Sequence, residues 1–372
     1  MLLSGIRVLD LTRVLAGPLC TMLLGDLGAD VLKVERPGEG DETRAWGPPF
    51  DDRGESAYYL SINRNKLGLV ADLDVPDDVA FVRGLIGDAD VVVENFRRDA
   101  LRRRGLDVRA LLEAHARLVW CTISGFGPDS HRPGYDFVLQ AERGWMAVNG
   151  EPEGRPLKAP VAIADVLTGK DAAIAILGAL VGRGGSRAPL SAAERHVQVS
   201  LAASATAGLV NVAQNVLVGG RDARRWGNAH ANLVPYQLFD AADRSLVVAV
   251  GNDAQWRACA TALDLPELAR DPRFATNPAR LANREALVGV LQERLRTRPA
   301  AEWRERLDAA GVPAGEVRTV AEALREVDAS PLTGVAPSVP GSVRFAPPRL
   351  DEHGALVRAH GWGAFARVAP LS

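Results

Sequence analysis

The sequence has few residues of the kinds that build disulfide frameworks, metal sites or base-stacking surfaces. Its three cysteines, Cys20, Cys121 and Cys259, form no CxxC pair, and its six histidines show no metal-ligand spacing. A disulfide framework or a metal site is therefore not expected. Aromatic residues make up 5% of the chain and the net charge is -2, so neither stacking nor a charged field predicts a nucleic-acid partner.

Signals for secretion, for a membrane span and for common nucleotide folds are also missing. The chain does not open with a basic stretch followed by an apolar one, and no uncharged run reaches the roughly 20 residues that cross a bilayer. We therefore expect a cytoplasmic protein without a membrane partner. No GxGxxG follows the first predicted strand, and neither a Walker loop nor GxSxG occurs. These absences disfavour a standard dinucleotide fold, a P-loop enzyme and a serine hydrolase.

Short apolar runs alternate with helical patterns over the first half of the chain. The runs predict strands over residues 6–11, 30–35, 67–73, 90–96 and 117–126. A repeated strand–helix–strand pattern is typical of an open parallel sheet, so the predicted class is α/β. Further on, an antiparallel hairpin is predicted near 236–250, followed by helices to about 310, which indicates a smaller α+β domain.

Cationic residues gather in the loops that follow the predicted strands. Parallel sheets bind ligands beyond the carboxyl ends of their strands, so these loops are expected at one edge. They carry Arg13, Arg36, Arg44, Arg64, Lys66, Arg97, Arg98, Arg102, Arg103 and Arg104. Guanidinium groups match phosphate oxygens in pairs, which favours a ligand with several phosphates. The alternative for "RRDALRRR" is an ordinary solvated surface.

One carboxylate, Asp165, interrupts the apolar stretch "PVAIADVLTG" just before a long helical pattern. Aspartate is a preferred helix cap, and this reading needs no chemistry. A carboxylate at a helix N-terminus is also stabilised by the helix dipole, so we expect Asp165 to be ionised. An ionised carboxylate can attack an acyl carbon. The residues alone leave cap and nucleophile open.

Several longer motifs together resemble the class III CoA-transferases, the family of formyl-CoA transferase and carnitine CoA-transferase. They occur in family order over most of the chain: "LSGIRVLDLTRVLAGPLC", "VLKVERPGEGDETRAWGPP", "ADVVVENFRRDALRRRGL", "AIADVLTGKDAAIAILGAL" and "GNAHANLVPYQLF". The resemblance implies an enzyme that moves CoA from an acyl-CoA donor to a small free carboxylic acid. It implies no tightly bound cofactor and no metal, with coenzyme A and its thioesters as substrates.

The resemblance also implies roles for single residues. Asp165 matches the nucleophile, which forms an aspartyl anhydride and then an aspartyl–CoA thioester. The positions that match CoA-contacting residues are Val14, Leu15, Arg36, Asn95, Phe96 and Arg103. Asp74 and the region of Pro133 replace two nucleotide-side lysines of formyl-CoA transferase, and Arg97, Arg98 or Arg104 could substitute for them. Expected on the substrate side are Arg44, Tyr135, Gly227 and His230.

The resemblance further implies the architecture and the assembly. The expected fold is a large Rossmann-like domain with a smaller α+β domain, in an interlocked homodimer. The expected division is 1–200 for the first part of the large domain, 201–225 for a linker, 226–325 for the small domain, and 326–372 for a second linker and the return to the large domain. Segment 227–232 keeps one glycine of a glycine-rich loop, so it should be stiffer than its counterpart.

Two other functions remain as alternatives. α-Methylacyl-CoA racemases resemble the N-terminal half of the chain, but they use a histidine and an aspartate for proton transfer. Their histidine position is occupied here by Tyr135, whose ordinary pKa near 10 suits that task poorly. A protein that binds CoA without turnover is the second alternative, and the presence of Asp165 argues weakly against it.

Overall fold

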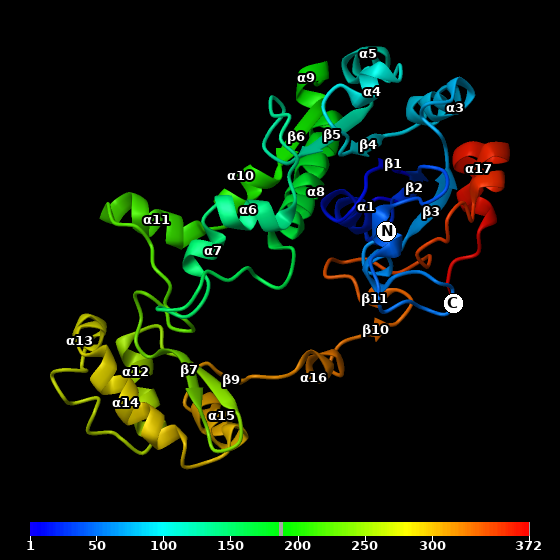
Figure 1. Ribbon diagram of the computed structural model, residues 1–372. Helices are drawn as coiled ribbons and strands as arrows, with labels where there is room; N and C mark the ends of the chain where they lie inside the picture. Colours follow the sequence, from blue (N-terminus) through cyan, green and yellow to red (C-terminus); the bar gives the residue numbers. More distant parts are fainter. Residues whose placement is uncertain (186–188, 372) are drawn as a thin grey trace. The chain divides into compact units, whose positions relative to one another are not determined.

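The chain forms two compact units in the computed structural model, which describes residues 1–185 and 189–371. The large unit contains the described residues of 1–146, 158–222 and 327–372, and the small unit contains 147–157 and 223–326 (Figure 1). The small unit is thus inserted into the sequence of the large one.

A six-stranded parallel sheet forms the centre of the large unit. Its spatial order is β3-β2-β1-β4-β5-β6 and all five pairings are parallel. The strands are β1 (Arg7–Leu11), β2 (Asp30–Glu35), β3 (Lys66–Val70), β4 (Val91–Glu94), β5 (Val119–Ser124) and β6 (His196–Ser200). The first five confirm the predicted strands and the α/β class. This order reverses between β1 and β4, which is the Rossmann arrangement and its topological switch point.

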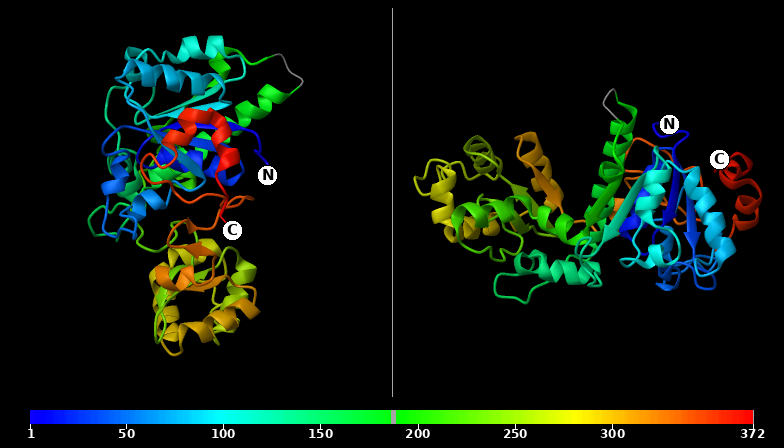
Figure 2. Two further views of the ribbon diagram at one scale, coloured as in Figure 1. Left: turned by 90° about the vertical axis from the view of Figure 1, so that its right-hand side faces the viewer. Right: turned by 90° about the horizontal axis from the view of Figure 1, so that it is seen from above.

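Both faces of the sheet are apolar because helices cover both of them. In β1, Val8 packs into one core and Leu9 into the other. The Val8 core is completed by α1 (Ala16–Asp26), α8 (Ile163–Gly184) and α10 (Leu201–Ala207). The Leu9 core is completed by α3 (Pro76–Gly87), α5 (Val108–Ala114) and α17 (Gly354–His360) (Figure 2).

Short elements complete the large unit and the connection to the small one. They are η1 (Glu42–Ala45), α2 (Ala57–Leu60), α4 (Ala100–Arg103), α6 (Asp136–Glu142), α7 (Trp145–Val148), α9 (Ala192–Arg195), α11 (Val210–Gly219), β10 (Ala329–Ser330), β11 (Gly334–Val335) and η2 (Gly361–Arg367). Among the described helices none is long and apolar enough by itself to cross a membrane; α10 and α11, bent by 71°, pass that test only as a pair.

The small unit is α+β, as predicted. Its antiparallel sheet has the order β7-β8-β9, and the β7–β8 pair is the expected hairpin. The elements are β7 (Tyr236–Asp240), β8 (Ser245–Ala249), α12 (Asp253–Ala262), α13 (Asn277–Ala282), α14 (Arg284–Leu295), α15 (Ala300–Ala309), β9 (Ala314–Glu316) and α16 (Val320–Leu324). Its own core includes Trp256 and Trp303, both fully buried, so this unit is an independent compact body.

Two predicted boundaries differ from the structure. Residues 201–225 were expected to be a linker, but most of them form α10 and α11 and belong to the large unit. Leu201, Ala202 and Ala205 are buried in the core, so α10 is held by packing rather than exposed as a connection. Residues 147–157 were expected in the large domain and belong to the small unit.

The C-terminal segment returns to the large unit and covers the outer edge of β3. The ring Nδ1 of His353 accepts from Gly68 N–H at 3.2 Å, and the backbone N–H of His353 donates to Gly68 O at 3.0 Å. Arg64, just before β3, forms a bidentate pair with Asp26 at 2.7 and 2.9 Å and donates to Thr333 O at 2.9 Å. Arg64 therefore ties α1 to the returning chain.

We expect Arg64→Met to lower the free energy of unfolding by about 3 kcal/mol, because it leaves the buried Asp26 carboxylate without its cation. Urea denaturation monitored by circular dichroism measures the change. Arg109→Met removes an exposed pair with Glu113 four residues along a helix and should change the value by less than about 0.5 kcal/mol. Equal effects of the two substitutions would contradict this account of the C-terminal return.

Candidate active site

The loop after β1 and the start of the segment after β4 are joined at the switch point of the sheet. The side-chain amide of Asn95 accepts from Arg13 N–H at 3.1 Å and donates to Arg13 O at 2.8 Å. In open α/β sheets, ligands bind in the crevice at this point, beyond the carboxyl ends of the strands. Asn95, predicted to lie beside CoA, therefore also fixes the backbone of the loop that leads into α1.

Val14 in this loop has a backbone conformation that a β-branched residue rarely adopts, with φ at 72°. Its N–H donates to Asp41 Oδ1 at 3.3 Å. Leu15 follows and precedes the first residue of α1, so both predicted loop residues lie at the entrance of this helix. Backbone strain of this kind persists only when the surroundings enforce it, and it gathers at functional sites.

Two fully buried ion pairs lie beneath this loop. Lys33 donates to Asp41 Oδ2 and to Thr12 O, each at 3.0 Å, and Lys66 pairs with Asp10 at 2.9 Å. Burial alone would raise the pKa of Asp10, but Lys66 and Lys33 hold it well below its usual range. Burial lowers the pKa of Lys66 to about 8, against the opposing pull of Asp10. The lysines therefore balance the carboxylates that shape the loop.

Asp165 lies in the first turn of α8 rather than at its cap. The helix begins at Ile163, the cap position is Ala162, and the residue at that position makes no side-chain capping bond. The cap prediction is therefore wrong. Asp165 is the third residue of the helix, whereas a capping residue directly precedes the first one. The residue is 8% exposed, so it is a nearly dry carboxylate on a rigid element.

The expectation that Asp165 is firmly ionised is also wrong. Burial raises the pKa of Asp165 to about 7, and the carboxylate of Asp136 contributes in the same direction. Desolvation and a like charge both disfavour the ionised form, and here they outweigh the helix dipole, whose effect is about 1 kcal/mol or less. A carboxyl group that titrates near neutral pH is typical of a functional site.

Asp136 also holds the first turn of α8 in place. Its Oδ1 accepts from Ala164 N–H and its Oδ2 accepts from Gln140 Nε2, at 2.8 and 2.7 Å. Gln140 in turn accepts from Ala159 N–H at 2.7 Å. Tyr58 lies close enough that burial and the charges of Asp165, Asp136 and Asp41 raise the pKa of its phenol to about 12. A hydroxyl donor thus stands near the carboxylates.

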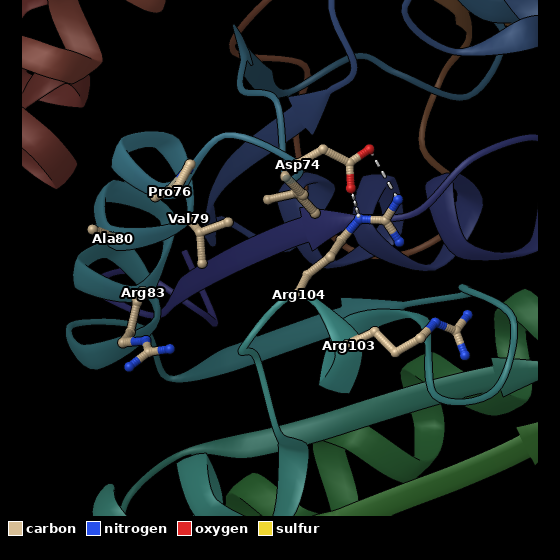
Figure 3. A pocket seen from close by; sticks show the side chains of 8 residues that line it. Asp74, Pro76, Val79, Ala80, Arg83, Arg103 and Arg104 are labelled. Carbon is tan, nitrogen blue, oxygen red and sulfur yellow. Dashed lines mark hydrogen bonds and ion pairs between the residues drawn. The ribbon is translucent and has the colours of Figure 1, made fainter.

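A pocket of about 490 Å³ opens beside α3 and α4 in the large unit (Figure 3). Its apolar wall includes Leu73, Val79 and Ala80, and three arginines, Arg83, Arg103 and Arg104, lie around it. The volume falls within the range of small-ligand sites. Cations around an apolar floor suit a phosphorylated group with a flat ring.

The two arginines predicted for the phosphates are in different states. Arg104 pairs with Asp74 through two contacts, at 2.8 and 3.2 Å, as the dashed lines in Figure 3 show. Its charge is therefore partly neutralised by the residue that replaces a family lysine. Arg103 is exposed and its side chain extends away from that pair. Of the two, Arg103 is better placed to meet an anion.

Arg44 does not lie where a substrate contact was predicted. Its Nε and Nη2 donate to Glu35 at 2.8 and 2.7 Å, and its Nη1 donates to Glu55 at 2.6 Å. Nη2 also donates to Tyr59 and to Pro348 O. Since every nitrogen already has an acceptor and the side chain is 9% exposed, Arg44 stabilises the fold around the C-terminal return.

The other predicted contacts are placed as follows. Arg36 donates to Gly40 O at 3.1 Å and pairs with Glu39, at the end of β2. Phe96 is half-buried against the Leu9 core, and its N–H donates to the side chain of Glu94. Tyr135 directly precedes Asp136 and is 55% exposed.

Gly227 and His230 belong to the small unit, and their segment is extensively hydrogen-bonded. Gly227 N–H donates to Gly150 O, and His230 N–H donates to Tyr236 O. The Nδ1 of His230 accepts from Asn232 N–H at 3.0 Å, and Arg284 donates to the carbonyls of His230 and Ala231. Each of these bonds lies within the small unit, and the predicted stiffness of the segment stays a prediction.

The sequence patterns did not point to Asp136, Gln140, Lys33 or Asp41 as residues of the site. Lys33 gave a signal, since a lysine in the middle of the apolar strand "DVLKVE" must find a buried partner. Gln140 and Asp136 gave no such signal, because their partners Ala159 and Ala164 are distant in sequence. No cluster of three metal-binding side chains occurs in residues 1–185 and 189–371.

The sequence is similar to those of known CoA-transferases. The sequence profile of CoA-transferase family III matches residues 3–353. The chain is 41% identical to succinate–glutarate CoA-transferase of Agrobacterium fabrum over 333 residues, covering 86% of this chain and 81% of that protein. It is 39% identical to succinyl-CoA:glutarate CoA-transferase of Mus musculus, covering 94% and 84%.

A solved structure shows the same fold. The crystal structure of a CaiB/BaiF family protein from Brucella suis has a TM-score of 0.82 and 38% identity, and the match covers 96% of this chain and 98% of that one. The profile, the relatives and the solved structure agree with the resemblance seen in the sequence. The chain belongs to CoA-transferase family III.

Proposed function

We propose that this protein transfers CoA from an acyl-CoA to a free carboxylate, with Asp165 as the nucleophile. The observation that carries the proposal is the state of Asp165: a nearly buried carboxylate on a rigid helix, with a pKa of about 7. A raised pKa makes the ionised form a stronger nucleophile, while a useful fraction remains ionised at neutral pH. The names of the relatives support the reaction class.

The proposed reaction has four balanced steps. The Asp165 carboxylate attacks the donor acyl carbon, and the C–S bond breaks to give an acyl–aspartyl anhydride and CoA thiolate. The thiolate attacks the aspartyl carbonyl and releases the donor acid, which leaves an aspartyl–CoA thioester. The acceptor carboxylate attacks that thioester and forms a second anhydride with release of thiolate. Thiolate attack on the acceptor carbon yields the new acyl-CoA and restores Asp165.

These intermediates require water to be kept out, because anhydrides hydrolyse. The burial of Asp165 supports this requirement. Oxyanions form at the attacked carbons and need hydrogen-bond donors. Candidates are the backbone N–H groups at the entrance of α1, near Val14 and Leu15, and the Tyr58 hydroxyl, which stays protonated because its pKa is raised to about 12.

For the acyl-CoA we propose an extended site at the switch point of the sheet. The adenine nucleotide would occupy the pocket around Arg83 and Arg103, with Arg36, Asn95, Phe96 and Arg104 near it. The pantetheine would pass the Val14–Leu15 loop toward Asp165. For the acceptor we propose a dicarboxylic acid, because relatives that share 39–41% identity are named for succinate and glutarate. Tyr135, next to Asp136 in the large unit, is the candidate that we propose for the acceptor side.

A homodimer is part of the proposal. Apolar side chains project from α11, with Leu217 76% and Val218 79% exposed, and Ile174 and Val181 of α8 are also exposed. Exposed large apolar side chains are often covered at an interface, and we propose that a second copy of the chain covers those of α11. Racemase chemistry is not favoured, since the named relatives are transferases and Tyr135 stands where that chemistry needs a histidine.

We expect Asp165→Asn to reduce CoA transfer by at least about 1,000-fold while CoA binding stays within a factor of three, because the nucleophile alone is removed. Mass spectrometry should show a wild-type adduct of enzyme with CoA after incubation with succinyl-CoA without acceptor, and none in the variant. Near-normal turnover by Asp165→Asn would rule out this nucleophile. Asp171→Asn, on the same helix, is the matched control and should retain activity.

The rate should depend on pH through Asp165. As pH falls through about 7, Asp165 takes up a proton and kcat/KM should decline. Asp136→Asn keeps an acceptor for Ala164 N–H but removes the like charge, so the midpoint should move to lower pH. Profiles of kcat/KM between pH 5 and 9 measure the shift. An unchanged or higher midpoint would show that Asp136 does not act on the charge of Asp165.

Arg103→Met should weaken CoA binding about 10- to 100-fold, because a charge-assisted bond to phosphate contributes about 1.5–3 kcal/mol. The value of kcat at saturating acyl-CoA should stay near that of the wild type. Isothermal titration with CoA measures the effect. Arg102→Met is the control, since Arg102 pairs with Asp99 at 3.2 Å. Equal affinities for Arg103→Met and wild type would place the nucleotide elsewhere.

A further inference from the structure

Helices α1 and α8 touch at a glycine that lies one turn after Asp165. A Cβ atom at Gly169 would lie 2.6 Å from the carbonyl oxygen of Ala16, and 3.2 and 3.3 Å from two side-chain carbons of Leu19. Contacts under 3.0 Å are essentially absent for real Cβ atoms. Because the nearest atom belongs to the backbone, no side-chain rotation could relieve the overlap.

The loop on the α1 side of this contact cannot retreat easily. Asn95 holds both the N–H and the carbonyl of Arg13, and Asp41 holds the N–H of Val14. Asp41 is itself fixed by the buried Lys33. A displacement of the α1 entrance would therefore break these partly buried bonds or disturb the fully buried Lys33–Asp41 pair.

The α8 side of the contact carries the nucleophile. Residues four apart on a helix share a face, so Asp165 lies next to Gly169 along α8. Asp136 fixes the same turn through Ala164 N–H at 2.8 Å. The distance between the α1 entrance and the Asp165 carboxylate is thus defined from both sides, and Gly169 is the point where the two sides meet.

We propose that Gly169 is a positioning residue whose lack of a side chain sets the distance between Asp165 and the loop of residues 13–16. The inference rests on the proposed function, in which Asp165 attacks a thioester that this loop helps to hold. Attack requires the reacting atoms to be about 3–3.5 Å apart, and a misplacement of about 1 Å can reduce a rate about 100-fold. A methyl group at position 169 would impose a shift of that order.

The main experiment compares Gly169→Ala with the wild type in two separate measurements. Rapid mixing with succinyl-CoA, without acceptor, followed by mass spectrometry gives the rate of enzyme–CoA thioester formation per CoA-binding site. We expect this rate to fall by about 10- to 100-fold. Calorimetry with CoA should give a dissociation constant within about threefold of the wild type, because the residues that line the arginine pocket proposed for the nucleotide do not include Ala16, Leu19 or Gly169.

Gly178→Ala is the matched control, since it lies on the same helix and a Cβ there meets no atom within 4 Å. It should have a wild-type thioester rate and equal or higher thermal stability. If Gly169→Ala is insoluble, Leu19→Phe overfills the same crossing and should show the same selective loss of rate.

A wild-type thioester rate in soluble Gly169→Ala, or in Leu19→Phe if only that variant is soluble, would overturn the inference. A loss that is fully explained by fewer CoA-binding sites would also overturn it, since it would show a role in folding alone. Failure of the proposed function looks different: the wild-type enzyme itself would form no aspartyl–CoA thioester, whatever Gly169 does.

Discussion

Two lysines without access to water stabilise the edge of the sheet where the ligand site is proposed. Lys33 and Lys66 are fully buried, and each must keep its carboxylate partner because no solvent can replace it. Asp41, paired with Lys33, also receives the N–H of Val14. That pairing therefore supports the unusual backbone of Val14 at the entrance of α1.

The carboxylate proposed as the nucleophile, Asp165, differs from the two that are paired with buried lysines. The shift of Asp165 arises from burial and from Asp136, with no cation among its causes. Asp10 and Asp41 are neutralised and structural, whereas Asp165 is left uncompensated on a rigid helix. Such a group lowers the stability of the folded state as pH rises from about 4 through 7, because the unfolded chain releases its proton more easily. The reactivity that we propose for Asp165 therefore comes with a lower stability of the folded protein.

The sequence predicted more of the fold than of the site. Five strands, the hairpin and the family could be recognised because apolar periodicity and ordered motifs are local. Asp165 was found, but its cap role and its firm ionisation were predicted incorrectly, since both depend on where α8 begins and on Asp136 across the fold. Arg44 was predicted to be a substrate contact because its sequence neighbours do not show its partners. Its acceptors Glu35, Glu55 and Pro348 come together around it only in the folded protein.

The covering of β3 has a consequence for how the chain matures. β3 is the outer strand of the sheet, and its exposed hydrogen-bonding groups are met by His353 and Asp351. During synthesis the six strands are complete by Ser200, yet this cover emerges more than 140 residues later. Until then the nascent large unit presents an open edge, which is a template for pairing with other chains. The segment that covers the β3 edge is therefore synthesised long after the strand that it protects.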